Sequence, residues 1–314
     1  MEGILVATYR CNARCHMCNI WQYPSKPEEE LPVEHYRKFP RLKFLNITGG
    51  EPFLRNELPE IIDIVKPKCD RICISTNGYY TERVIDIAKK HPDLGFRISL
   101  EGLPAANDEL RGIKDGFDHG IRTLLQLHRL GVKDIGFGIT VSDRNYKDLI
   151  ELYDLANWLG VEFATAIVHN GAYFHKNDNV IQNKEEISEA FRELVRELFK
   201  TRRPKNWFRA YFNHGIINYV NGGRRLLPCK MGEDIFFCDP WGEIKPCNVL
   251  EDSMGNLKDF DTFEMLWNSD RAKEVRAAAR HCGRECWMIG SVSPAIKENK
   301  WHVIKWILRN KWSY

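Results

Sequence analysis

The chain has 314 residues, of which 43% are hydrophobic and 28% charged, and its formal net charge is +3. This length allows one large domain or one domain with a smaller appendage, and the charge is too small to indicate a nucleic-acid partner. No signal peptide precedes the first predicted strand, and no apolar run is long enough to span a bilayer. Ten cysteines without a secretion signal favour metal chemistry in a reducing cytoplasm over a disulfide framework.

The first half of the chain repeats a unit made of a short β-rich run, a turn and an amphipathic helical pattern. The runs suited to strands are Ile4–Thr8, Phe44–Thr48, Ile72–Ser75, Phe96–Leu100, Ile135–Val141 and Val161–Val168. The helical patterns between them include Leu58–Val65, Thr81–Lys90, Phe117–Leu130 and Tyr146–Leu159. Because each helix provides a crossover, six such units predict an α/β fold with a parallel sheet, either an open doubly wound sheet or a barrel.

Polar residues, cysteines and glycines follow every predicted strand at its C-terminal end. These segments are Cys11–Cys18, Gly49–Pro52, Thr76–Gly78, Glu101–Gly102, Ser142–Arg144 and His169–Asn170. Barrels and open α/β sheets place their active sites at this edge, so we expect the segments to meet there. A lone histidine is usually structural, and His169 and His175 are therefore not assigned to the site.

Cys11, Cys15 and Cys18 are spaced C-x3-C-x2-C on one short loop. Three thiolates can hold three corners of a cubane iron–sulfur cluster and leave the fourth iron without a protein ligand. An open metal position is where chemistry can take place, whereas a structural site is closed. The alternative on spacing alone is a zinc knuckle that lacks one ligand.

These cysteines, with Met17 before the last of them, resemble the C-x3-C-x-Φ-C motif of radical S-adenosylmethionine (SAM) enzymes. The segment Asn46–Pro52 resembles the GGEP motif of the same superfamily, in which Gly49, Gly50, Glu51 and Pro52 hold the methionine amino group of SAM. The resemblance implies a partial (βα)6 TIM-type barrel and a 4Fe–4S cluster whose open iron is chelated by SAM. It also implies cleavage of SAM to a 5′-deoxyadenosyl radical that takes hydrogen from a substrate. Glycines at this turn would let the backbone approach a ligand closely.

Further SAM contacts follow from the same resemblance. Ser99 and Glu101 resemble the ribose-contacting positions, and Arg111 resembles an arginine near the SAM carboxylate. A guanidinium fork is suited to pair with a carboxylate, but an ordinary surface ion pair is equally compatible with the sequence. Asn77 is either a SAM contact or part of a simple Asn-Gly turn.

A second cysteine set begins at Cys229. The runs Asp234–Cys238 and Glu243–Cys247 predict a β-hairpin. Cys229, Gly242 and Cys247 resemble the C-x(9–15)-G-x4-C opening of SPASM and twitch auxiliary-cluster domains. The metal ligands implied by this resemblance are Cys229, Cys247, Cys282 and Cys286.

Four thiolates close the coordination of a second, auxiliary 4Fe–4S cluster, which suits electron transfer. The spacing of Cys282 and Cys286 departs from the usual pair, so Cys282 is a weaker candidate than Cys286. Cys238 is interpreted as a buried thiol outside the ligand set. Zinc bound by four cysteines is the alternative for this site.

Three parts are expected: a radical SAM partial barrel over 1–180, a helical linker over 181–225, and a twitch-like domain over 226–314 that combines the hairpin with a C-terminal helix. Trp301, Ile304, Leu308 and Trp312 fall on one face of that helix. We expect this aromatic face to dock on the protein, in preference to contact with a membrane.

The resemblance implies a cytoplasmic oxidoreductase that removes hydrogen from an unidentified substrate and passes an electron through the auxiliary cluster. A low-potential donor such as ferredoxin or flavodoxin would be its partner. A radical SAM peptide maturase is the alternative within the superfamily, although little sequence precedes Cys11 to bind a leader peptide. A zinc-stabilised binding protein without turnover is the alternative of another class.

Overall fold

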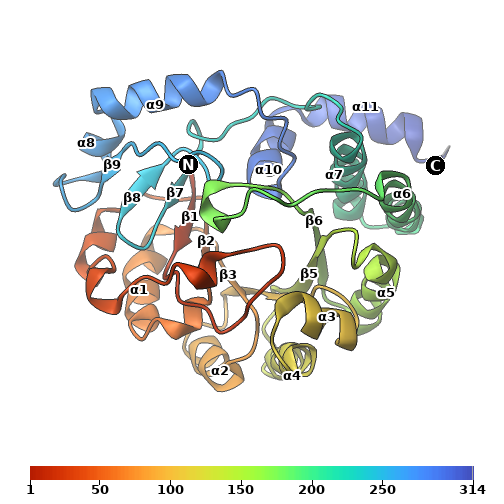
Figure 1. The fold of residues 1–314 in the computed structure, drawn as a ribbon, viewed down its shortest axis with the longest axis horizontal. Coiled ribbons are helices and arrows are strands. Elements are labelled where there is room, and N and C mark those ends of the chain that lie inside the picture. Colours follow the sequence, from red (N-terminus) through yellow and green to blue (C-terminus); the bar gives the residue numbers. More distant parts are fainter. Residues whose placement is uncertain (313) are drawn as a thin grey trace.

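The computed structural model describes residues 1–312 and 314. One curved sheet runs through the molecule in the order β6-β5-β4-β3-β2-β1-β7-β8-β9 (Figure 1). Its strands are β1 (Glu2–Val6), β2 (Phe44–Thr48), β3 (Ile72–Thr76), β4 (Gly95–Ser99), β5 (Ile135–Val141), β6 (Glu162–Ile167), β7 (Ile235–Cys238), β8 (Glu243–Lys245) and β9 (Gly255–Asn256). The first six strands are parallel, which confirms the predicted α/β fold and the partial barrel.

The crossover helices lie on the outside of the curved sheet (Figure 1). They are α1 (Leu58–Val65), α2 (Thr81–Lys90), α3 (Pro104–Arg111), α4 (Gly116–Arg129) and α5 (Leu149–Leu159). The apolar stripe of each helix packs on the strands, so Ile62, Val84 and Leu124 share one core cluster with Leu45, Ile74 and Phe96. This packing places the C-terminal ends of the strands together at one rim.

The hairpin of β7 and β8 extends the barrel sheet. Strand β7 pairs in parallel with β1, with Glu2 opposite Ile235 and Leu5 opposite Cys238. Strands β7 and β8 pair antiparallel, as the sequence predicts. The hairpin therefore lies directly beside the strand that leads into the Cys11–Cys18 loop.

Helices from the second half of the chain cover the open side of the barrel beside β6 (Figure 1). They are α6 (Lys184–Lys200), α7 (Pro204–Val220), α10 (Ile289–Glu298) and α11 (Lys300–Asn310), while α8 (Phe263–Trp267) and α9 (Asp270–Arg280) lie near the hairpin. Buried Trp287 anchors the segment between α9 and α10, because its indole N–H donates to the Phe212 carbonyl at 2.7 Å. A Cβ at Gly215 would lie 2.0 Å from this indole, so α7 needs glycine there.

The C-terminal helix α11 docks on the protein as expected, but through a different face. Val303 and Ile307 are buried in the core, and Trp306 packs beside Phe199 and Tyr211. The predicted docking face was wrong because α6 and α7 supply aromatic partners for Trp306 and leave Trp301, Leu308 and Trp312 exposed. Within the described residues, no helix combines the length and apolarity needed to cross a membrane.

Candidate active site

The loop after β1 borders a cavity of about 190 Å³ at the C-terminal ends of β2 to β5. Most residues singled out for the first cluster and for SAM line this cavity, namely Cys11, Cys15, Met17, Cys18, Gly49, Gly50, Asn77, Ser99, Glu101 and Arg111. Two residues of the GGEP segment, Glu51 and Pro52, are buried and do not line it. The parallel sheet thus brings together segments from five strand ends, because the C-terminal ends of parallel strands meet at one edge of the sheet.

Glu51 braces the ends of two neighbouring strands. Its carboxylate accepts hydrogen bonds from the Thr76 hydroxyl at 2.7 Å and from the backbone N–H of Asn77 at 2.8 Å. It also accepts from the Phe53 N–H at 3.2 Å. Burial raises the pKa of Glu51, while the Asn77 N–H and the Thr76 hydroxyl act in the opposite direction. In this arrangement Glu51 positions the Gly-Gly turn and the Asn77 turn.

Gly49 and Gly50 allow a close approach of two backbone segments. A Cβ at Gly50 would lie 2.4 Å from the Arg10 carbonyl oxygen, and a Cβ at Gly49 would lie 2.7 Å from the Thr8 carbonyl oxygen. The Gly50 N–H donates to the Thr8 carbonyl at 2.7 Å, and the Glu51 N–H donates to the Arg10 carbonyl at 2.8 Å. These glycines therefore fasten the turn after β2 to the segment that enters the cysteine loop.

Gly50→Ala should consequently lower the free energy of unfolding by about 1–3 kcal/mol, because the added methyl group meets backbone that cannot rotate away. Urea unfolding monitored by circular dichroism measures this change. The matched control is Gly290→Ala, where the nearest atom to a new Cβ is Ile4 Cδ1 at 3.5 Å. Equal unfolding midpoints for the two variants would remove this role of Gly50.

Arg111 is buried and does not form a surface ion pair. Its guanidinium donates to the Glu101 carboxylate at 3.1 Å, and that carboxylate also accepts from the Thr140 N–H at 2.6 Å. Within the described part of the chain, Arg111 Nε is buried without a hydrogen-bond partner. The Arg111 carbonyl accepts from the Arg14 N–H at 2.9 Å and thereby ties α3 to the cysteine loop. A buried, partly unsatisfied guanidinium facing a cavity fits a carboxylate-bearing ligand such as SAM.

The thiols of the first set need a positive partner to ionise. Burial raises the pKa of Cys11 and of Cys18 to about 12, and burial also raises the pKa of Cys15 although Arg111 opposes this. Bound metal compensates such a penalty by deprotonating the thiol outright. The donor set therefore fits an iron–sulfur cluster. Among the described residues, no three His, Cys, Asp or Glu side chains are grouped closely enough to hold a single metal ion.

The thiols of the second set are electrostatic neighbours. Burial is the main reason that the pKa of Cys247 is raised to about 11, and the nearby Cys229 and Cys286 contribute to the rise. Burial raises the pKa of Cys286 as well, and the neighbouring Cys282 also raises it. The Cys247 sulfur accepts from the backbone N–H groups of Val249 and Leu250, both at 3.4 Å. Such N–H···S contacts suit a metal-bound thiolate.

Arg225 holds the backbone segment that carries Cys286. The Arg225 guanidinium donates to the Leu227 carbonyl at 2.7 Å and to the Ser291 carbonyl at 3.0 Å. Arg225 also donates to the Cys286 carbonyl. Its guanidinium also lies 5.3 Å from the centre of the Trp287 ring. Cys238 is fully buried in β7, and its sulfur contacts the neighbouring Asp239 carbonyl. Its placement is compatible with a thiol outside the ligand set.

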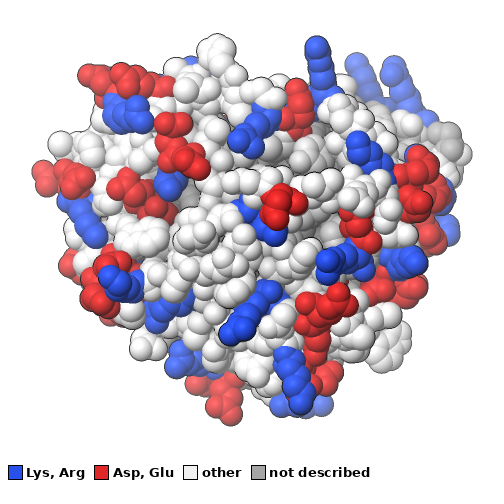
Figure 2. Space-filling view, viewed as in Figure 1, with Lys and Arg blue, Asp and Glu red and all other residues white. Residues whose placement is uncertain are grey.

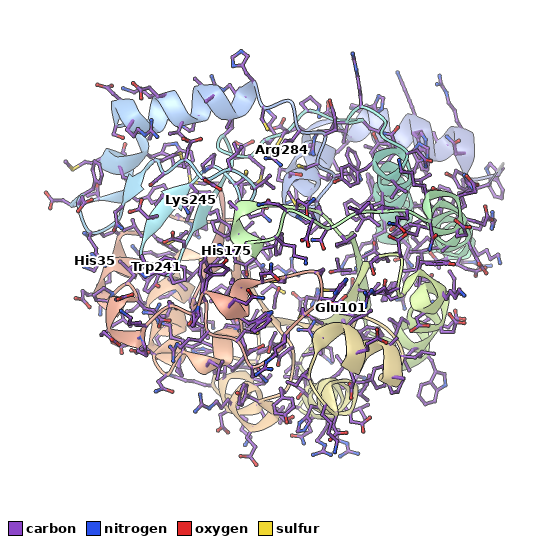
Figure 3. All side chains as sticks on the ribbon, in the orientation of Figure 1. His35, Glu101, His175, Trp241, Lys245 and Arg284 are labelled. Carbon is purple, nitrogen blue, oxygen red and sulfur yellow. The ribbon has the colours of Figure 1, made fainter. Side chains whose placement is uncertain are left out.

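A larger cavity of about 550 Å³ has one cysteine of the second set, Cys247, in its wall. Tyr173 lines both cavities, and its hydroxyl donates to the Gly49 carbonyl at 2.6 Å, while Cys247 lines only the larger cavity. Figure 3 shows His175, Trp241 and Lys245 grouped together, apart from Glu101. The rings of Tyr9 and Trp241 pack edge to face with their centroids 5.0 Å apart. The ring of Tyr23 stacks on that of His175 with a centroid distance of 4.3 Å. Sequence patterns did not reveal this cavity because its walls come from three separate segments.

Comparison with known proteins identifies the superfamily. Residues 5–156 match the family model described as Radical SAM superfamily. The chain is 32% identical to Fe-coproporphyrin III synthase of Methanosarcina barkeri, over 47% of this chain and 39% of the relative. It is 24% identical to the subtilosin biosynthesis protein AlbA of Bacillus subtilis, in an alignment that covers 94% of this chain and 68% of AlbA. It is 26% identical to the mycofactocin maturase MftC of Mycolicibacterium smegmatis, in an alignment that covers 88% of this chain and 74% of MftC.

The solved structure of SuiB from Streptococcus suis has the same fold, with a TM-score of 0.67, 16% identity and coverage of 90% of this chain and 68% of that one. The family match therefore identifies residues 5–156 as a radical SAM domain, and the likeness to SuiB shows the fold. It spans about two fifths of the length of the Fe-coproporphyrin III synthase that it matches.

Proposed function

We propose that this chain is a radical SAM oxidoreductase with a SAM-binding cluster and an auxiliary cluster. The observation that carries the proposal is the 550 Å³ cavity, which shares Tyr173 as a wall with the proposed SAM cavity and has Cys247 of the second thiol set in its lining. A substrate in this cavity would contact Tyr173, which borders the proposed SAM site, and Cys247 of the proposed auxiliary site. A low-potential donor such as ferredoxin or flavodoxin would supply the electron for each turnover.

In the first site, Cys11, Cys15 and Cys18 would hold a 4Fe–4S cluster, and the residues around the 190 Å³ cavity would hold SAM. When bound, this cluster would supply the electron for reductive cleavage of SAM and so for hydrogen-atom abstraction from the substrate. Arg111 would pair with the SAM carboxylate through its unsatisfied Nε. Glu51 and the two glycines would keep the turn after β2 in place.

The walls of the larger cavity are suited to a two-electron oxidation. Burial raises the pKa of Tyr9 and Tyr173, so both phenols in the cavity wall stay neutral. Burial and the nearby Lys245 lower the pKa of His175, so its imidazole is neutral at pH 7 and can accept the proton that the substrate loses. The second electron would pass to a closed cluster held by Cys229, Cys247, Cys282 and Cys286.

Peptide modification is the second candidate function. It is favoured by the maturase relatives AlbA and MftC, which align over most of this chain, and by a solved structure of SuiB bound to precursor peptide SuiA. Deuterium transfer into 5′-deoxyadenosine from labelled peptides, compared with labelled small molecules, distinguishes the two functions. The labelled compound that transfers deuterium defines the substrate class.

Anaerobic reconstitution should load about eight irons per chain, because each of the two thiol sets would hold four. Iron and sulfide analysis measures this number. A plateau at about four irons would remove the auxiliary cluster from the account. A colourless protein that retains zinc after anaerobic purification would instead support a zinc-stabilised binding protein without turnover.

A further inference from the structure

The outward face of α11 is apolar and aromatic although the helix is firmly docked. Trp301 is 78% exposed, Leu308 68% and Trp312 86%, while Val303 and Ile307 on the other side are buried. Two exposed tryptophans and a leucine along α11 and the turn that follows it cost free energy in water unless another surface covers them. The helix is fixed on the protein, because Trp306 on its inner side packs against Tyr211 and His214.

Positive charge surrounds this face. Residues 300–314 contain four lysines and arginines and no acidic residue, whereas the whole chain has a net charge of only +3. The remaining residues therefore sum to −1, so the excess of positive charge is concentrated in this segment. Figure 2 shows lysine and arginine side chains standing out from the surface where Figure 1 places α11.

A second element extends the same surface. The Lys311 ammonium lies 3.5 Å from the centre of the Trp207 ring at the start of α7. This contact places the α6–α7 loop, with exposed Arg202 and Arg203, beside the end of α11. Exposed cations from two parts of the chain that are distant in sequence thus lie beside the exposed tryptophans of the C-terminal segment.

We propose that this surface, formed by Trp301, Lys305, Leu308, Trp312 and the adjacent Arg202 and Arg203, docks on an anionic phospholipid bilayer. Tryptophan prefers the headgroup level of a membrane, and lysine and arginine bind anionic headgroups there. Tryptophan and arginine are also enriched in protein–protein interfaces, so a protein partner is the alternative outcome that the vesicle experiment decides. The outward exposure of the tryptophans replaces the expectation from sequence alone, in which these side chains covered the protein.

The test is cosedimentation of the full chain with phosphatidylcholine vesicles that contain or lack phosphatidylglycerol. Binding should need the anionic lipid and weaken with added salt. Lys305→Gln should lower the partition coefficient about five-fold. The double variant Trp301→Ala/Trp312→Ala should lower it about ten-fold or more, since both side chains would leave the apolar boundary.

Trp158→Ala is the matched control, because Trp158 is 83% exposed on α5, away from the cationic surface. This variant should bind anionic vesicles as the wild type does. The proposal is overturned if the wild type does not sediment with anionic vesicles, or if Trp158→Ala and the double variant lose binding equally. Circular dichroism of each variant shows whether the overall helix content is retained.

Discussion

Replacing Cys229 and Cys247 together by alanine should abolish product formation and leave slow, uncoupled cleavage of SAM measurable. The reason is the separation of the two thiol sets. Cys247 lines the larger cavity and not the cavity formed by the Cys11–Cys18 loop. The variant therefore removes ligands of the proposed electron acceptor and leaves every residue around the SAM cavity in place.

Two assays on the same sample measure this outcome. Dithionite-driven formation of 5′-deoxyadenosine reports SAM cleavage, and mass spectrometry reports the substrate product. Cys238→Ala is the matched control, since Cys238 is also a cysteine of the hairpin but is buried in β7. It should keep both activities. Loss of product in Cys238→Ala together with normal turnover in Cys282→Ala would show that the fourth ligand is misassigned.

Local patterns in the sequence were sufficient for the barrel. The bounds of β2 and β5 agree with the predicted runs Phe44–Thr48 and Ile135–Val141, because each run is β-rich and ends at a turn. The rim location of the first site followed from the parallel topology alone, since the C-terminal ends of such strands meet at one edge.

Long-range pairing was outside the reach of those patterns. The position of β7 beside β1 depends on contacts between distant segments, although one signal was present. Ile235–Cys238 is an unbroken apolar run, which is typical of a parallel strand buried on both faces. The docking face of α11 depended in the same way on the aromatic partners that α6 and α7 supply to Trp306.

Side-chain environments also required the structure. The sequence alone was compatible with a surface ion pair at Arg111, whereas the structure buries this side chain beside Glu101. His175 was not assigned to the site, because a single histidine carries no positional signal. The structure places it in a left-handed backbone conformation, with φ of 46°, on the wall of the larger cavity. Such uncommon backbone geometry in a non-glycine residue is concentrated at functional sites.

The triple variant Cys11→Ala/Cys15→Ala/Cys18→Ala should lose all reductive cleavage of SAM. These three thiols are the cysteines that line the 190 Å³ cavity with Gly49, Gly50 and Arg111. A closed set of four thiolates offers no free iron to SAM, so the second site is not expected to substitute for the first. The matched control is Cys69→Ala/Cys73→Ala, which removes two thiols that line neither cavity.

The most direct measurement is the yield of 5′-deoxyadenosine from SAM and dithionite, without any other substrate, in these variants after anaerobic reconstitution. The account predicts slow formation by the wild type, similar formation by Cys69→Ala/Cys73→Ala, and none by the Cys11/Cys15/Cys18 triple variant. Formation of 5′-deoxyadenosine by the triple variant at the wild-type rate would contradict the assignment of SAM cleavage to the loop after β1.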